Sequence, residues 1–113
     1  MGSYRHHAII VTSYDYPEAA EKMEMVYAKA KELFGPLVSE KVKTKLNGFI
    51  SFFVAPDGSK EGWEESDYAD KQRAELVGFI EEQQCSDGGN PIKYAELFYG
   101  DDDRGEVGVE SHN

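Results

Sequence analysis

Polar and apolar residues alternate along positions 38–46, and a continuous apolar run follows. The alternating set comprises Lys41, Lys43 and Lys45 on one face and Val42, Thr44 and Leu46 on the other. Alternation at period two predicts an edge strand with one apolar and one polar face. The run over positions 49–55 predicts a strand that is covered on both faces. The Asn47-Gly48 pair between them predicts a hairpin turn.

The segment before this hairpin predicts a strand and then a helix. Arg5–Ser13 is apolar on both alternating faces, which is typical of a central strand. A helix is expected after a cap at Asp15 or Tyr16, with Pro17 in its first turn and Gly35-Pro36 at its end. The residues of its inner stripe recur at helical spacing and are Ala19, Met23, Val26, Ala30 and Leu33.

The second half of the chain predicts another helix and a last strand. The helix is expected from about Ser66 to Gln84, and the strand over Ile92–Tyr99. The inner positions of this helix are Ala69, Arg73 through its aliphatic stem, Leu76 or Val77, and Ile80.

The resulting order, βαββαβ, predicts an α+β domain of the ferredoxin-like class. Its four-stranded antiparallel sheet carries both helices on one face. Right-handed crossovers place the first and third strands in the centre and the second and fourth at the edges. We expect this domain to cover residues 1–100, and the acidic segment 101–113 to be a disordered tail.

A sheet covered on one side leaves its other face open. If Val42, Thr44 and Leu46 face the helices, the three lysines point to the open side. On the last strand Ala95 and Leu97 suit the helices, which leaves Tyr94, Glu96 and Phe98 outward. An aromatic face flanked by lysines is typical of an interface. It favours a homodimer, or a platform that binds a small anionic nucleotide.

The charge balance changes the choice of partners. The chain of 113 residues has 22 acidic and 12 basic residues, for a net charge of −10. This excess argues against binding to long nucleic acid, which relies on clustered cations. It favours solubility or attraction to a basic protein surface. No apolar stretch reaches the ~20 residues that cross a bilayer, and no secretory leader pattern is present, so we expect a cytoplasmic protein without membrane contact.

The loop over positions 56–63 is the most unusual segment. Asp57 precedes Gly58, and Ser59 and Lys60 lie between Gly58 and Gly62, just before Trp63. Ser59 and Lys60 have the chemistry to meet an anion near a helix start. The loop either connects two elements with Trp63 folded over the core, or forms the lip of a binding site.

Side chains for catalysis or metal binding are sparse. His6 and His7 are adjacent on a strand and point to opposite faces, so they do not chelate one ion together. The acids of positions 61–70 are interpreted as solvated charges near a helix N-terminus. The single Cys85 excludes an intrachain disulfide. We therefore expect no metal, no cofactor and no assigned catalytic residue; an enzyme with His6 or His7 as general base is the alternative.

Two segments carry a resemblance. His6-His7-Ala8-Ile9-Ile10-Val11-Thr12-Ser13 and Ala55-Pro56-Asp57-Gly58-Ser59-Lys60-Glu61-Gly62-Trp63 resemble a family of small uncharacterised proteins of tailed bacteriophages, over about Tyr4 to Asp102. The resemblance implies a phage setting and expression in the bacterial cytoplasm. It brings no activity, cofactor or site residue with it.

The sequence as a whole predicts a non-enzymatic binding protein. It would inhibit or sequester a host component, in host takeover or anti-defence, as a homodimer or higher oligomer. The target would be a basic protein surface or a small anionic nucleotide. The expected binding residues are Lys41, Lys43, Lys45, Asp57, Ser59, Lys60, Trp63, Tyr94 and Phe98. A small enzyme that acts on a nucleotide or metabolite, and a structural dimerisation module, are the alternatives.

Overall fold

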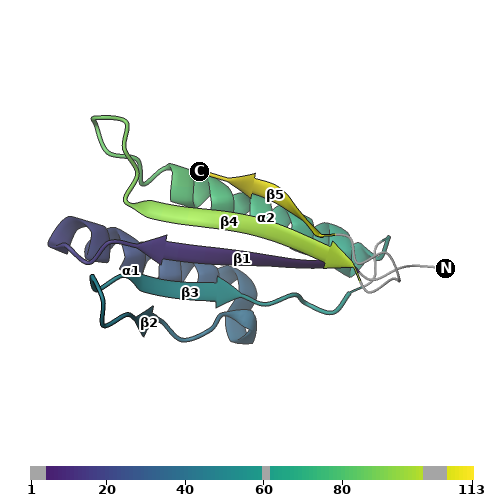
Figure 1. Cartoon of the computed structure of the whole chain (residues 1–113). Helices are drawn as coiled ribbons and strands as arrows, with labels where there is room; N and C mark the ends of the chain where they lie inside the picture. The colour runs from purple at the N-terminus through teal and green to yellow at the C-terminus, as the bar shows by residue number, and fades with distance from the viewer. Residues whose placement is uncertain (1–4, 60–61, 101–106) are drawn as a thin grey trace.

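An antiparallel sheet of five strands forms one layer of the computed structural model, which describes residues 5–59, 62–100 and 107–113 (Figure 1). The strands lie in the order β2-β3-β1-β4-β5. Their bounds are β1 Arg5–Ser13, β2 Val42–Lys43, β3 Ile50–Val54, β4 Ile92–Gly100 and β5 Val107–His112. The predicted α+β class is confirmed, with five strands rather than four. β1 and β3 are interior strands, as predicted.

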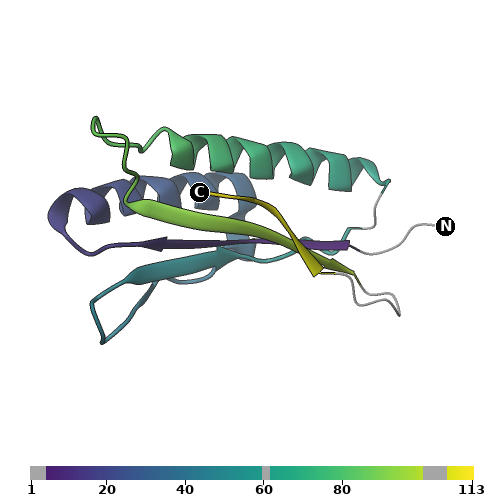
Figure 2. The same cartoon turned by 45° about the horizontal axis from the view of Figure 1, so that its top comes forward.

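Two long helices form the second layer. α1 (Pro17–Phe34) and α2 (Glu64–Glu81) lie on the same side of the sheet, as Figure 2 shows. Pro17 occupies the first turn of α1, where its missing N–H costs no hydrogen bond. Gly35 ends α1 at a positive φ of 55° and begins the short 3-10 helix η1 (Gly35–Leu37).

The hydrophobic core lies between the helices and the sheet. Each helix buries one stripe of residues. In α1 the buried stripe contains four of the five predicted residues, and Phe34 is buried in place of Leu33. The predicted inner positions of α2 are confirmed at Ala69, Arg73, Leu76 and Ile80. The largest fully buried side chains on the sheet side are Ile9, Val11, Val54 and Ile92.

The C-terminal segment differs from its prediction. Residues 107–112 form β5, which pairs with β4, so β4 is not an edge strand. The predicted disordered tail is therefore wrong for this part, and residues 101–106 lie outside the described residues. Asn113 strengthens the pairing because its side-chain amide donates to the Ile92 carbonyl at 2.8 Å and accepts from the Tyr94 N–H at 3.0 Å.

The β2–β3 hairpin is looser than predicted. Val42 pairs with Ser51 and Lys43 with Ile50, and the Thr44 N–H donates to the Phe49 carbonyl at 2.8 Å. A four-residue loop over positions 45–48 thus replaces the expected two-residue turn. Its last two residues, Asn47 and Gly48, both have positive φ, which explains the choice of these residue types.

Candidate functional site

Two of the three lysines in the row point away from the predicted face, and the third, Lys45, is exposed in the loop that follows β2. Lys41 forms an ion pair with Glu24 of α1, and Lys43 Nζ lies 2.6 Å from an Asp15 carboxylate oxygen. Both lysines therefore lie on the helix side of the sheet, and the prediction of a cationic open face is wrong. The reason is that β2 lies at the edge, where the helices do not bury it. Its polar face reaches the acids that border α1, and its apolar face extends the open side.

The loop before α2 lies far from these lysines. The hairpin precedes β3 and the loop follows it, so the two segments lie at opposite ends of that strand (Figure 1). Asp57 accepts hydrogen bonds from the N–H and Oγ of Ser59 at 3.1 and 2.8 Å. Lys60 lies outside the described residues. Trp63 is the exposed N-cap residue of α2. The structure does not bring the predicted lysines and the loop into one site.

Two aromatic residues of β4, Tyr94 and Phe98, also face the helices. Tyr94 is buried, and its hydroxyl donates to a Glu81 carboxylate oxygen at 3.5 Å. Phe98 is half-buried under the Arg5 guanidinium, whose carbon lies 4.9 Å from the ring centroid. The prediction that Tyr94, Glu96 and Phe98 point outward is therefore wrong.

A buried ion pair explains the orientation of β4. Glu96 is only 8% exposed, and Arg73 Nε lies 3.4 Å from its carboxylate. Arg73 also pairs with Asp70. Burial raises the pKa of Glu96 against the lowering effect of Arg73, and repulsion from Glu110 raises it further. The predicted burial of Arg73 was the sequence signal that could have indicated an inward-facing acid on the sheet, because a buried cation requires a buried anion.

The open face of the sheet is apolar rather than cationic. Its most exposed hydrophobic side chains come from all five strands and are Ile10, Val42, Phe53, Tyr99, Val107 and Val109. The first four of these line a hollow of about 420 Å³, together with Ala8 and Leu97. The two β5 valines stand beside it, because they pair with Tyr99 and Leu97. This face is therefore exposed and hydrophobic, without the lysines that were predicted to flank it.

The outer surface of α2 is strongly acidic. The helix has two cations, Lys71 and Arg73, and Arg73 is buried. Its carboxylates are Glu64, Glu65, Asp67, Asp70, Glu75 and Glu81. The acids in the first turn of α2 are stabilised by the positive end of the helix dipole. The dipole does not account for the acids farther along the helix.

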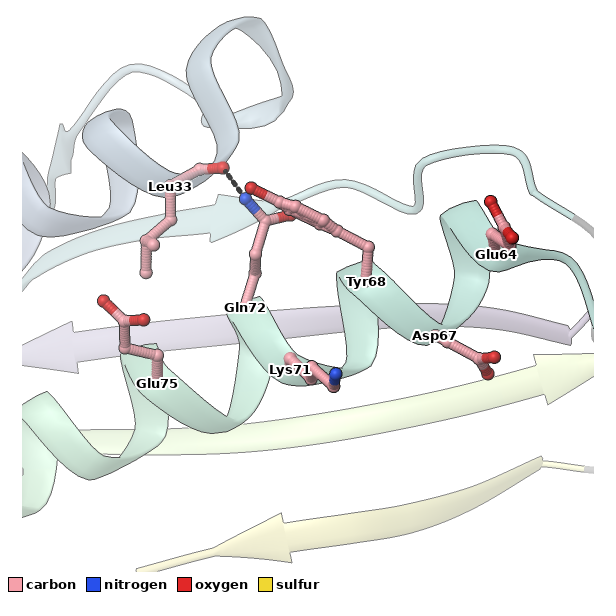
Figure 3. Close-up of a pocket in the computed structure, with 7 residues that line it drawn as sticks. All are labelled: Leu33, Glu64, Asp67, Tyr68, Lys71, Gln72 and Glu75. Carbon is pink, nitrogen blue, oxygen red and sulfur yellow. Dashed lines mark hydrogen bonds between the residues drawn. The ribbon is translucent and has the colours of Figure 1, made fainter.

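A pocket of about 560 Å³ lies where α2 meets the end of α1 (Figure 3). Gln72 Nε2 donates to the Leu33 carbonyl at 2.7 Å and joins the two helices. The Tyr68 ring lies beside this bond, and Glu75 points toward the Leu33 side chain. Glu64, Asp67 and Lys71 complete the lining. The pocket combines hydrophobic surface with three carboxylates and one cation, which is the chemistry that receives a lysine or arginine side chain.

Other chemistry has less support in the described residues. His6 lies against Tyr99 with ring centroids 5.0 Å apart, and His7 lies 6.3 Å from Phe98, so the two imidazoles occupy opposite faces as predicted. Within residues 5–59, 62–100 and 107–113, no group of three His, Cys, Asp or Glu side chains is placed to hold a metal ion. Neither helix of this part has the length and apolar character to span a membrane.

Comparison with known proteins gives no assignment. No model of a protein family matches the chain, and no curated protein shows significant similarity to it. The resemblance to small proteins of tailed bacteriophages therefore stays a prediction, and the geometry of the surfaces is the basis for a functional proposal.

Proposed function

We propose that this chain is a non-enzymatic binding protein of bacteriophage origin that captures a basic host protein in the bacterial cytoplasm. The pocket between α1 and α2 is the contact site. It receives an arginine or lysine side chain of the partner, and the acids of α2 surround the contact. Capture inhibits or sequesters the partner. The resemblance of the His6–Ser13 and Ala55–Trp63 segments to phage proteins supports the setting.

The lining of the pocket carries this proposal. Tyr68 is 57% exposed, so its ring offers a face to a cation, and Leu33 offers hydrophobic surface to the aliphatic stem. Glu64 and Asp67 supply carboxylates at one end. Glu75 supplies a third, which already holds Lys29 at 2.7 Å from its Nζ. A partner cation there would share this carboxylate with Lys29.

The lysines support a basic partner over a nucleotide. Lys41 and Lys43 are engaged by Glu24 and Asp15, and binding a phosphate would require them to leave these carboxylates. A basic partner meets the acidic surface of α2 directly. Long-range attraction to a chain of net charge −10 also accelerates its association.

The topology supports a finer description of the fold. We propose that β1, α1, β2, β3, α2 and β4 form a ferredoxin-like unit to which β5 is added at the β4 edge. The order β2-β3-β1-β4 and the placement of both helices on one face support this description. The unit presents its helix layer as the binding surface.

Affinity capture from bacterial lysate tests the proposed function. The immobilised full chain is expected to retain a basic protein. The Tyr68→Ala variant is expected to lose at least about tenfold in retained partner, since an aromatic anchor at the centre of an interface often supplies 2 kcal/mol or more. Tyr14→Ala is the matched control because Tyr14 is a similarly exposed tyrosine at the other end of α1.

Charge variants make the test specific to the pocket. Asp67→Lys and Glu82→Lys change the net charge equally at opposite ends of α2. The proposal predicts loss of capture with Asp67→Lys and near-native capture with Glu82→Lys. Equal loss in both variants would indicate attraction by net charge alone, and capture that survives both Tyr68→Ala and Asp67→Lys would contradict the pocket as the contact site.

A further inference from the structure

We propose that the open face of the sheet binds a second copy of this chain, with the β5 valines of each copy in the sheet hollow of the other. Six hydrophobic side chains on this face are between 42% and 73% exposed. Exposure on this scale across one continuous face is unusual for a monomer and marks an interaction site.

The exposed area suits a dimer. Taking roughly 150–200 Å² for a large hydrophobic side chain, these six side chains present about 550 Å² of apolar surface. An interface of standard size buries about 800 Å² per partner. The six side chains therefore supply most of what a stable dimer requires, and the backbone and the smaller residues Ala8 and Ser51, which line the hollow, add the rest.

The distribution of charge favours a second copy over an unrelated partner. Although the chain has 22 acidic residues, the strand residues that point to this face include no carboxylate. Glu96, the acid of β4, points to the helices. Two copies with the same net charge of −10 repel each other elsewhere, and this face is where they can approach without burying an acid. A basic partner, in contrast, would find no carboxylate here.

The shape of the face is self-complementary. Val107 and Val109 of β5 pair with Tyr99 and Leu97 of β4, so they stand on the open side next to the hollow. They are among the most exposed hydrophobic residues of the chain. A twofold axis over the sheet places the valines of one copy over the hollow of the other, and the reciprocal contact follows from the symmetry.

Sedimentation velocity of the full chain, from micromolar to near-millimolar concentration, tests this proposal. The native chain is expected to sediment as a dimer, with twice the 12.7 kDa mass of one chain. Val109→Lys is expected to raise the dimer dissociation constant by at least about tenfold, because it buries an unpaired charge in the interface. Met25→Lys is the matched control, since Met25 is a comparably exposed hydrophobic residue on α1. Circular dichroism checks that each variant is folded.

Disulfide trapping supplies a second readout that does not depend on destabilising the fold. In one chain, Val109 and Phe53 are three strands apart, or roughly 14 Å at the usual strand spacing, which is too far for an intrachain disulfide. The triple variant Val109→Cys, Phe53→Cys, Cys85→Ser should therefore oxidise to a covalent dimer. Each variant with a single cysteine at one of the two positions should give markedly less.

Several outcomes would overturn the proposal. A native chain that stays monomeric across the concentration range contradicts it. So does a dimer that Val109→Lys leaves intact, or a triple variant that fails to form the covalent dimer. If the native chain is a monomer and captures a lysate protein, and Val109→Lys abolishes this capture, the open face of the sheet binds a different partner. The pocket variant Tyr68→Ala is expected to dimerise normally, so failure here and failure of the proposed function are distinguishable.

Discussion

Gly108→Ala tests how β5 docks on the rest of the protein. A Cβ atom at position 108 would lie 2.7 Å from Cε1 and 3.0 Å from Cε2 of Phe98, and closer still to Cζ. Such contacts are shorter than van der Waals packing allows. The ring has little freedom to move aside, because the Arg5 guanidinium covers it and His7 lies beside it. Either β5 or the ring must shift.

The expected loss follows from overpacking. Inserting a methyl group into a filled site costs about 1–3 kcal/mol of unfolding free energy. Gly78→Ala is the matched control with the opposite sign, because Gly78 is exposed on α2 and a Cβ there meets nothing within 4 Å. Alanine in an exposed helix position is expected to stabilise the protein by roughly 1 kcal/mol. The two variants should therefore differ by roughly 2–4 kcal/mol.

Urea unfolding followed by circular dichroism measures both values. The three proteins are compared at one concentration, because the stability of a dimer depends on it. A Gly108→Ala variant as stable as the native chain would refute the close packing of β5 on Phe98. A loss of stability in both variants would show that the effect is not specific to this contact.

Three further predictions concern single side chains. Because burial raises the pKa of Glu96 above its ordinary 4.5, the folded state binds more protons than the unfolded chain, and unfolding free energy falls as pH rises from 4.5 through the raised pKa. Urea titrations over this range should give a flatter pH dependence for Glu96→Gln than for the native chain or for Glu82→Gln; equal slopes would contradict the buried carboxylate. Asn113→Ala removes two hydrogen bonds to the β4 backbone and should cost about 1–2 kcal/mol in urea unfolding; an unchanged midpoint would show that these bonds contribute nothing. Lys43→Gln should lower the unfolding free energy by less than about 1 kcal/mol, since its pair with Asp15 is partly exposed; a larger loss would indicate a structural role that the exposure does not suggest.

The long elements could be predicted from the sequence because each has a strong local pattern. Arg5–Ser13 forms β1 with the predicted bounds. The helical spacing of apolar residues gave the buried stripes of both helices, and Pro17 and Gly35 marked the limits of α1. These signals depend on the residues of one segment and on periodicities that tertiary contacts rarely change.

Which side chains of β2 and β4 point to the helices could not be predicted from the sequence, because it depends on tertiary contacts. The alternation along β2 was correctly recognised, but which face is dry depends on how far the helices extend over the sheet, and they do not bury this edge strand. On β4, a glutamate lies inside because Arg73 of α2 lies opposite. A pattern of hydrophobicity alone assigns such a residue to solvent.

β5 and the pocket had no local signature. Val107–His112 is short and has only two hydrophobic residues, and it follows an acidic stretch, so its composition favoured a tail. Its pairing depends on the free edge of β4 and on the absence of a side chain at Gly108. The pocket joins Leu33 and Gln72 across 39 positions of the chain, and only the packing of α1 on α2 brings them together.

Carbodiimide cross-linking of the captured complex, which joins carboxylates directly to lysines, tests the central claim most directly. The account predicts that cross-links to the partner concentrate on Glu64 and Asp67 at the end of α2 and diminish with Tyr68→Ala. Cross-links confined to other acids, such as Glu18 and Glu21 near the opposite end of α1, would contradict the pocket as the site where a basic partner binds.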